Sequence, residues 1–127
     1  MMRDGAKQDI WIGIDLGTQS VRAIAATNDG DIIGSGAYPL FSTHFENRHE
    51  QNPEDWWIAV GHACREMCRT IDGPHRICGV AVCGTSGTVL LTDGKGRALT
   101  SALMYDDARA ATECDEANTI GAVLWQN

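Results

Sequence analysis

The sequence has few of the features that mark export, membrane insertion or nucleic-acid binding. Its 127 residues include only 10 lysines and arginines against 17 acids, a formal net charge of -7. That balance excludes a general basic surface for phosphate backbones. No apolar run approaches the roughly 18 residues of a membrane-spanning helix, and residues 1–9 lack the apolar stretch of a signal peptide. We therefore expect a cytoplasmic protein with no nucleic-acid or membrane partner.

The sequence also lacks the cysteine pattern that is typical of a structural zinc site. Cys64 and Cys68 lie four residues apart, one helical turn, with His62 nearby. Structural zinc sites usually use two CxxC-like pairs, and no second pair exists among the 5 cysteines. We expect reduced, buried thiols and no metal bound by cysteine.

The length and the 43% hydrophobic content are enough for one domain with a real core. Residues 1–9 are predicted to be a disordered leader, and residues 10–127 the folded part. The sequence stops just after the apolar residues Val123, Leu124 and Trp125, so we expect an incomplete domain. Unpaired strand edges would then favour self-association, and a homodimer is among the expected partners.

Hydrophobic periodicity predicts a mixed α/β chain. Three strands at the start, separated by turn residues, indicate an antiparallel meander. Asn52 and Pro53 are typical of a helix start, and Gly73 with Pro74 is typical of its end. The predicted strands are 10–14, 21–26, 32–38, 77–83, 89–91 and 98–104, with a loop at 42–52 and helices at 53–72 and 106–120.

The turn between the first two strands is the first candidate site. Gly17 permits close approach of a ligand, and successive amides from Gly17 to Gln19 can form an anion-binding concavity. The hydroxyls of Thr18 and Ser20 add donors. Asp15 would repel a phosphate directly, which suggests a divalent cation held through water. A plain hairpin turn is the alternative interpretation.

Two later segments carry further polar groups. Thr85, Ser86 and Gly87 interrupt a predicted buried strand and suit hydrogen bonding to a polyol, although a β-bulge gives the same pattern. Tyr105, Asp107 and Arg109 supply a ring, a carboxylate and a guanidinium, which suit a sugar site. Acids favoured at a helix N-terminus and an ordinary salt bridge are the simpler explanation of that segment taken alone.

Taken together, these segments resemble the FGGY carbohydrate kinase family. The resemblance rests on Ile12-Gly13-Ile14-Asp15-Leu16-Gly17-Thr18, the helix opening Asn52-Pro53-Glu54-Asp55-Trp56-Trp57, the Thr85-Ser86-Gly87-Thr88 core with Asp93-Gly94 after it, and Ala102 to Ala110. Their order and spacing match from about residue 10 to residue 112.

The resemblance implies a ribonuclease-H-like domain of the actin and hexokinase type, here an incomplete first lobe of a two-domain sugar kinase. It implies transfer of the ATP γ-phosphoryl group to a sugar hydroxyl with Mg²⁺. Asp15 would organise the metal through water, with Arg22 supporting the loop, and the ATP phosphates would face Gly17, Thr18, Gln19 and Ser20. The sugar would be bound by Thr85, Ser86, Gly87, Tyr105, Asp107 and Arg109.

The resemblance points to a ketopentose, with D-ribulose favoured and xylulose as the near alternative. The family's catalytic base is a later Asp that no segment here matches, and neither Asp106 nor Asp107 is a substitute for it. We therefore expect the base beyond residue 127 and no turnover by this chain alone. The alternatives are a catalytically inactive nucleotide- or sugar-binding module and an actin-like assembly domain.

Overall fold

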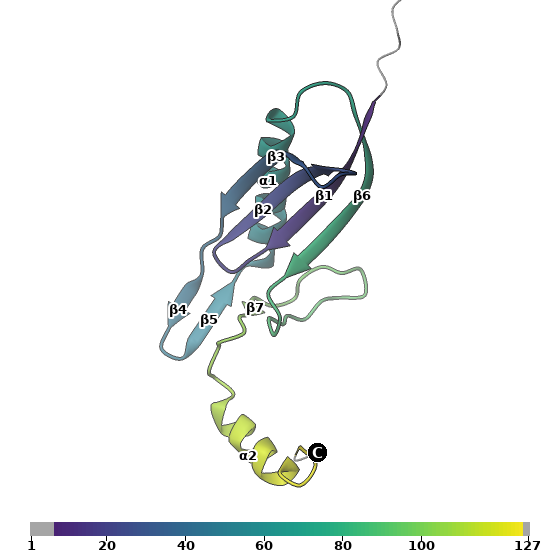
Figure 1. The fold of residues 1–127 in the computed structure, drawn as a ribbon. Helices are drawn as coiled ribbons and strands as arrows, with labels where there is room; N and C mark the ends of the chain where they lie inside the picture. The colour runs from purple at the N-terminus through teal and green to yellow at the C-terminus, as the bar shows by residue number, and fades with distance from the viewer. Residues whose placement is uncertain (1–6, 126–127) are drawn as a thin grey trace, which may run out of the picture. The chain divides into compact units, whose positions relative to one another are not determined.

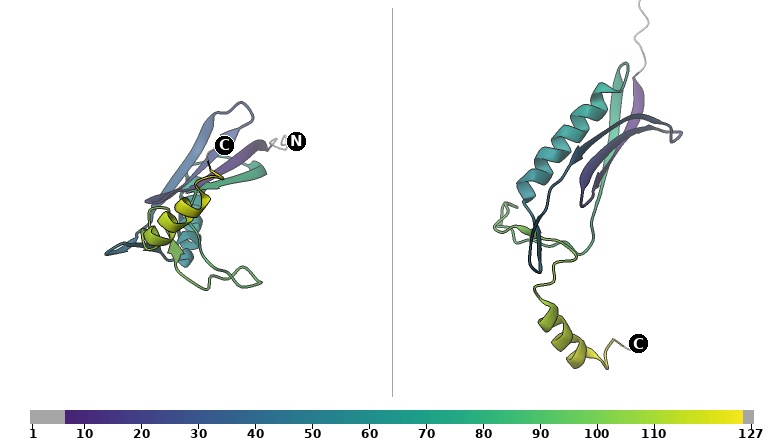
Figure 2. Two further views of the ribbon diagram at one scale, coloured as in Figure 1. Left: turned by 90° about the horizontal axis from the view of Figure 1, so that it is seen from below. Right: turned by 90° about the vertical axis from the view of Figure 1, so that its left-hand side faces the viewer.

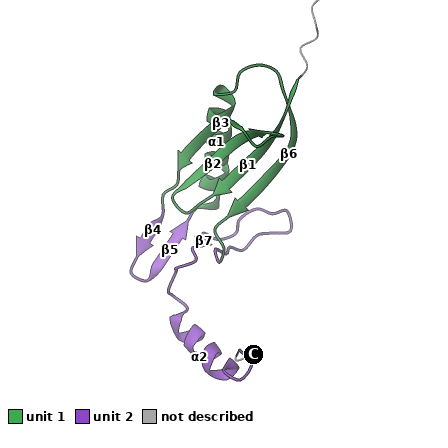
Figure 3. Cartoon of the chain, viewed as in Figure 1, with its two compact units in different colours: residues 1–41, 52–86 green, residues 42–51, 87–127 purple. Residues whose placement is uncertain are grey.

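The computed structural model describes residues 7–125, and the contacts within the chain divide it into two compact units. Unit 1 combines residues 1–41 and 52–86, and unit 2 combines residues 42–51 and 87–127. Figure 3 draws the two units in separate colours. Each unit consists of two segments that are separate in the sequence, and the unit is defined by the contacts within it.

Unit 1 is a four-stranded sheet with one helix on it (Figure 1). The strand order is β3-β2-β1-β6, with antiparallel pairing among the first three and parallel pairing of β1 with β6. The predicted meander is therefore confirmed. The elements are β1 (Gln8–Leu16), β2 (Ser20–Thr27), β3 (Ile32–Pro39), α1 (Pro53–Arg69) and β6 (His75–Gly84).

Strand β1 begins two residues earlier than predicted. Gln8 pairs with His75, and the Asp9 carboxylate accepts two hydrogen bonds from the Arg76 guanidinium, at 2.8 and 2.6 Å. The predicted disordered leader is therefore wrong for these two residues, because pairing with β6 orders them. Its first six residues lie outside the described part of the chain.

The sequence at the start of α1 explains where the helix begins. The Asn52 side chain accepts a hydrogen bond from the Glu54 amide, Pro53 occupies the first turn, and two acids follow there. The helix ends at Arg69, earlier than the predicted Gly73, because Thr70 caps it with its amide and its hydroxyl, both donating to the Met67 carbonyl. Thr70 thus satisfies a carbonyl that would otherwise lack a partner.

Helix α1 packs on β2 and β3 and covers one face of that half of the sheet (Figure 2). Ala59, Ala63 and Met67 are fully buried there. A Cβ on Gly36 of β3 would collide with the Ala63 carbonyl oxygen and the Met67 amide nitrogen. Small residues on both elements therefore set how closely the helix approaches the sheet. The core of the sheet contains Ile10, Ile12, Val21, Ala23 and Ala25.

Strand β6 was predicted to be buried, and this is wrong for its apolar side chains. Ile77, Val80 and Val82 are 56%, 59% and 68% exposed. The reason is that α1 covers the β2 and β3 side of the sheet, while β6 is the edge strand in the described residues. The predicted burial of the thiols is also wrong for four of the five, because Cys68, Cys78, Cys83 and Cys114 are exposed.

Unit 2 contains a small antiparallel sheet in the order β4-β5-β7. Its first two strands fall in the segment predicted as loop, so that prediction is wrong. Their inward residues are His49 and Gln51, 7% and 4% exposed. The elements are β4 (Thr43–Phe45), β5 (Arg48–Gln51), β7 (Ala102–Leu103) and α2 (Ala111–Gly121).

The two strands predicted at 89–91 and 98–104 are shorter than expected. Only β7 is regular, and isolated bridges join Val89 to Leu103 and Thr92 to Ala98. The Leu91 amide donates to the Thr100 hydroxyl at 3.2 Å, so a side chain replaces a backbone partner of the ladder. The predicted turn at Asp93 is confirmed by its amide, which donates to the Arg97 carbonyl at 2.9 Å.

Helix α2 begins at Ala111, five residues after the predicted start. The Asp107 carboxylate accepts a hydrogen bond from the Arg109 amide at 3.2 Å, which holds residues 107–109 in a turn.

Among the described residues, no helix is long and apolar enough to cross a membrane.

The close contact between α1 and β3 generates a stability prediction. We expect Gly36→Ala to lower the free energy of unfolding by about 1–3 kcal/mol, because the added methyl group forces α1 away from the sheet. Urea unfolding measures the loss. The matched control is Gly94→Ala, whose Cβ would meet nothing within 4 Å and which should change stability by no more than about 0.5 kcal/mol. Equal stability of the two variants would contradict the role of Gly36.

Candidate functional site

The β1–β2 turn forms one part of the candidate site. It connects Leu16 at the end of β1 to Ser20 at the start of β2. The Gly17 amide donates to the Ser20 carbonyl at 3.1 Å, and the Gln19 carbonyl accepts from the Leu40 amide at 2.8 Å. The Gly17 amide thus has a partner within the turn.

The same edge of the sheet carries Thr85, which sequence alone grouped with the sugar. Its amide donates to the Leu16 carbonyl at 3.3 Å, and its hydroxyl lies 3.4 Å from that of Thr18. The cause is the parallel register, in which Leu16 pairs with Gly84. Strands that run in parallel end at the same edge, where ligands of α/β sheets bind. The structure therefore joins Thr85 to the β1–β2 turn.

Asp15 lies next to this turn and is paired weakly. Its Oδ2 is 3.6 Å from Nη1 of Arg22, its cross-strand neighbour, and the two side chains are 47% and 68% exposed. Such an exposed pair contributes little to stability. The Cys83 thiol donates to Asp15 Oδ1 at 3.6 Å. A pocket of about 350 Å³ adjoins Asp15, Arg22 and Cys83, so there is room beside the carboxylate.

Asp15 offers a metal one accessible carboxylate, with 47% of its side chain exposed. Residues 7–125 contain no group of three or more His, Cys, Asp or Glu side chains arranged to hold a metal. A single accessible carboxylate nevertheless fits Mg²⁺, which keeps several waters and is often held by one or two carboxylates plus substrate phosphates. The donor set therefore fits a hydrated magnesium ion and does not fit a structural metal.

In unit 2, Asp107 and Arg109 form a tightly bonded pair. Arg109 Nε donates to Asp107 Oδ1 at 2.9 Å, and Arg109 Nη2 donates to Oδ2 at 3.0 Å. The His49 amide also donates to Asp107 Oδ2, at 2.8 Å. These partners, Arg109 first, hold the pKa of Asp107 well below its usual range. The Asp107 side chain is only 6% exposed, and both of its carboxylate oxygens accept hydrogen bonds from within the protein.

Arg109 has a second carboxylate partner that the sequence interpretation missed. Its Nη2 lies 2.8 Å from Oε1 of Glu50 on β5, and the two side chains are 29% and 27% exposed. Both carboxylates raise the pKa of Arg109, Asp107 more strongly than Glu50. The guanidinium is therefore charged and fixed between them.

His49 is the second residue that sequence reasoning missed. Its Nδ1 lies 2.5 Å from Asp106 Oδ1, and its ring lies against that of His44 in a tilted arrangement, with centroids 4.0 Å apart. Its carbonyl accepts from the Met104 amide at 2.9 Å. Its Nε2 is buried and has no partner among the described residues. Alternate side chains of β5 are buried, but these buried side chains are polar. Hydrophobic periodicity in the sequence therefore could not predict this strand.

The remaining predicted residues divide between the units. Thr85 and Ser86 belong to unit 1, and Gly87 and Tyr105 to unit 2. Gly87 has a φ of 80°, and a Cβ there would lie 3.3 Å from Cβ of Tyr105. The Tyr105 side chain packs beside this glycine yet stays 59% exposed, so it could stack on a ligand.

Comparison with known proteins gives a consistent result. The sequence profile of the FGGY family of carbohydrate kinases, N-terminal domain, matches residues 10–123. A xylulose kinase from Klebsiella pneumoniae is 31% identical over 113 residues, which are 83% of this chain and 22% of that protein. A glycerol kinase from Gluconobacter oxydans is also 31% identical over 113 residues. The chain therefore spans about a fifth of the length of these relatives.

Solved structures show the same fold. The chain superposes on a xylulose kinase from Rhodospirillum rubrum with a TM-score of 0.79 and 25% identity, over 86% of this chain and 23% of that one. A gluconate kinase from Lactobacillus acidophilus gives a TM-score of 0.81 at 18% identity, over 91% and 23% of the two chains. These structures confirm the predicted actin- and hexokinase-like architecture, of which this chain is a part.

The lowered pKa of Asp107 predicts a pH-dependent contribution to stability. In the unfolded chain the pKa of this carboxyl is about 3.9. Because the folded value is lower, its stabilising effect is present above pH 4 and is lost as the pH falls through the folded pKa. We expect Asp107→Asn to be less stable than the native chain at pH 7 and the difference to shrink between pH 4 and pH 2.

Urea unfolding at pH 7, 4, 3 and 2 measures this difference. Asp115→Asn on the exposed face of α2 makes the same chemical change without an arginine partner and should follow the native curve throughout. A stability difference for Asp107→Asn that stays constant from pH 7 to pH 2 would contradict the assignment.

Proposed function

Because this chain belongs to the FGGY family of carbohydrate kinases, we propose that it is the N-terminal part of an ATP-dependent kinase that phosphorylates a ketopentose. The observation that carries the proposal is the meeting of the β1–β2 turn with Thr85 at one sheet edge. There the Thr18 and Thr85 hydroxyls lie 3.4 Å apart. Phosphoryl transfer depends mainly on positioning and on donors for the phosphate oxygens, and the two hydroxyl groups at this edge support the proposal as donors of that kind.

The chain's own residues would position the nucleotide. The ATP phosphates would lie against the turn, where Gly17 leaves space for them and Thr18, Gln19 and Ser20 provide polar groups. Magnesium, when bound, would offset phosphate charge. Asp15 would orient its water ligands, and Arg22 lies beside the Asp15 carboxylate on the neighbouring strand. The acidic balance of the chain offers no general attraction for ATP, so recognition must be local.

Within unit 2, the sugar would contact Gly87, Tyr105 and Arg109, with Asp107 holding the arginine. The names of the relatives favour xylulose over the D-ribulose that the sequence motifs favoured. We therefore propose D-xylulose as the first substrate to test and D-ribulose as the second.

Asp107 is unsuited to act as the general base for the attacking hydroxyl. A general base works best with a pKa near the operating pH, and that of Asp107 is strongly lowered. Asp106 is occupied by His49. The base is accordingly assigned to the later Asp that the family resemblance implies, and this chain would supply binding and orientation.

Nucleotide binding by the chain tests this proposal. We expect ADP to bind more tightly with Mg²⁺ than without it, and Asp15→Asn to remove most of that gain, about tenfold in Kd or about 1.4 kcal/mol. Calorimetric titration of ADP with and without Mg²⁺ measures both. The control is Asp29→Asn in the β2–β3 turn, an exposed carboxylate of the same unit, which should leave the Mg²⁺ effect intact.

Two results would count against the proposal. Binding of ADP that does not respond to Mg²⁺ would remove the assigned role of Asp15. Absence of any nucleotide binding by the folded chain would favour an assembly role for this fold over a kinase role.

A further inference from the structure

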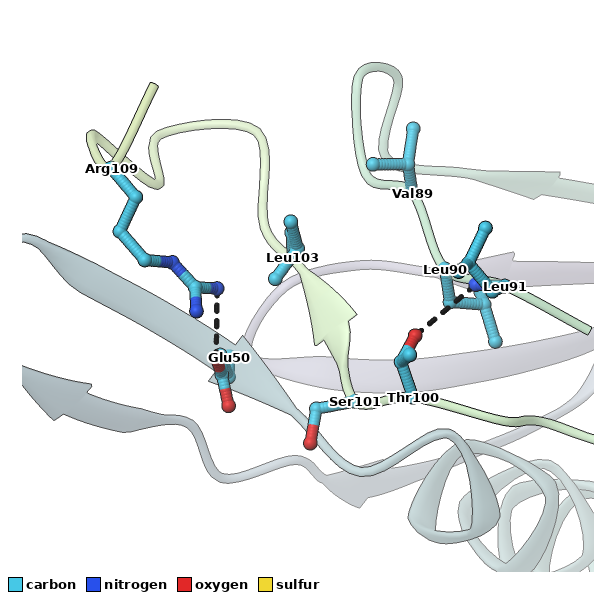
Figure 4. A pocket seen from close by; sticks show the side chains of 8 residues that line it. All are labelled: Glu50, Val89, Leu90, Leu91, Thr100, Ser101, Leu103 and Arg109. Carbon is cyan, nitrogen blue, oxygen red and sulfur yellow. Dashed lines mark hydrogen bonds and ion pairs between the residues drawn. The ribbon is translucent and has the colours of Figure 1, made fainter. Parts of the chain in front are cut away.

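Two pockets of comparable volume lie in different units of the chain. The pocket of about 370 Å³ in unit 2 contains Glu50 and Arg109 (Figure 4), so it belongs to the candidate site described above. The pocket of about 440 Å³ lies in unit 1, along α1, and none of its residues belongs to the nucleotide or sugar site proposed above. Its lining residues are Trp57, Ile58, Val60, Gly61, Cys64 and Arg65.

This second pocket opens on the side of α1 that faces away from the sheet (Figure 2). Ala59, Ala63 and Met67 face the core, and at 3.6 residues per turn the opposite side of the helix carries a different set of positions. We call this set the outer face; its residues are Glu54, Trp57, Ile58, Gly61, Arg65 and Cys68. Trp57 and Ile58 are 77% and 52% exposed. Exposed aromatic and aliphatic surface of this kind is typical of protein–protein contacts.

Gly61 leaves a gap in the middle of the outer face. A Cβ on this glycine would lie 3.5 Å from Nη1 of Arg65, so the guanidinium lies beside the gap. Glycine weakens a helix interior relative to alanine. The gap permits a second helix or a large side chain to approach the backbone of α1 closely.

Opposite charges lie at the two ends of the outer face. Glu54 is in the first turn of α1, whereas Arg65 and Arg69 are near its end. Among residues 7–125, none of these three side chains forms an ion pair. A second α1 helix that runs antiparallel would bring its acidic end to the basic end of the first. The outer face is therefore complementary in charge to a copy of itself.

From this arrangement we propose that the outer face of α1 binds a second copy of this chain, with the two α1 helices antiparallel and a two-fold axis at Gly61. Trp57 of each copy then packs beside Gly61 and Cys64 of the other copy, in the pocket along the helix. Glu54 of each copy pairs with Arg65 of the other copy, on the opposite side of the axis. The interface is isologous, so each of these contacts occurs twice.

This dimer differs from the association through unpaired strand edges that the sequence predicted, because its contacts come from α1 and leave β6 free. It does not depend on the proposed kinase function, since the outer face contains no residue assigned to nucleotide or sugar. A single helix pair makes a small interface. We therefore expect a reversible dimer with a Kd of about 10–100 µM.

Sedimentation equilibrium of the 127-residue chain in reducing buffer tests the inference. We expect a monomer–dimer equilibrium, and Trp57→Ala should raise its Kd at least tenfold because both tryptophan contacts are lost. The matched control is Trp125→Ala, which makes the same change at a 64% exposed tryptophan of unit 2 and should leave the Kd unchanged. Circular dichroism checks that each variant is folded.

A charge exchange tests the antiparallel pairing itself. Arg65→Glu should raise the Kd about tenfold, because it places two carboxylates opposite each other. Adding Glu54→Arg to that variant should return the Kd to within about threefold of the native value, a rescue that a merely structural role for either residue would not produce. Lys95→Glu in the exposed turn after Asp93 makes the same charge change and should have no effect.

Three outcomes would overturn the inference. The first is a chain that stays monomeric at ten times the expected Kd. The second is a Trp57→Ala variant that associates like Trp125→Ala, or a double variant that associates no better than Arg65→Glu alone. The third is association that Val82→Lys on the exposed strand β6 abolishes while Trp57→Ala does not, which would assign the dimer to the strand edge.

Discussion

The parallel pairing of β1 with β6 is the constraint on which the nucleotide end of this structure depends. In that pairing Leu16 lies opposite Gly84, so two turns that are almost 70 residues apart in sequence leave the sheet at the same edge. A shift of one residue would turn every side chain of β6 to the other face and would separate Thr85 from the β1–β2 turn. The bidentate contact between Asp9 and Arg76 joins the opposite ends of the two strands, on the other side of an irregularity between Ile10 and Trp11 where the register shifts by one residue.

Close packing between α1 and β3 supports that sheet from one side. The fully buried residues of the helix, Ala59, Ala63 and Met67, are small or flexible, and β3 contributes Gly36, so the two backbones approach until no Cβ fits at that glycine. Because α1 covers β2 and β3, the apolar side chains of β6 stay exposed in the described residues. Exposed apolar edge strands are sites where further chain can pair, which agrees with a chain that spans about a fifth of the length of its relatives.

Electrostatics organises the second unit. Three of its acidic side chains are held by specific partners: Asp107 by Arg109 and by a backbone amide, Asp106 by His49, and Glu50 by Arg109. The Asp107 carboxylate already accepts four hydrogen bonds and has little capacity left for a ligand, whereas Glu50 forms an ion pair with Arg109 and is 27% exposed. The difference between Asp107 and Glu50 is therefore one of remaining hydrogen-bonding capacity and not of charge.

The sequence by itself determined the meander, the start of α1, the turn at Asp93 and the family, because each depends on local signals: alternating apolar residues, capping residues and motif spacing. Only the tertiary structure decided the rest. The sequence did not predict the hairpin of β4 and β5, because its buried residues are polar. It did not predict the exposure of β6 either, because burial depends on where α1 packs. The contact of Thr18 with Thr85 and the pairing of Glu50 with Arg109 join residues distant in sequence. Strand register and sheet order bring such residues together, and no local pattern encodes them.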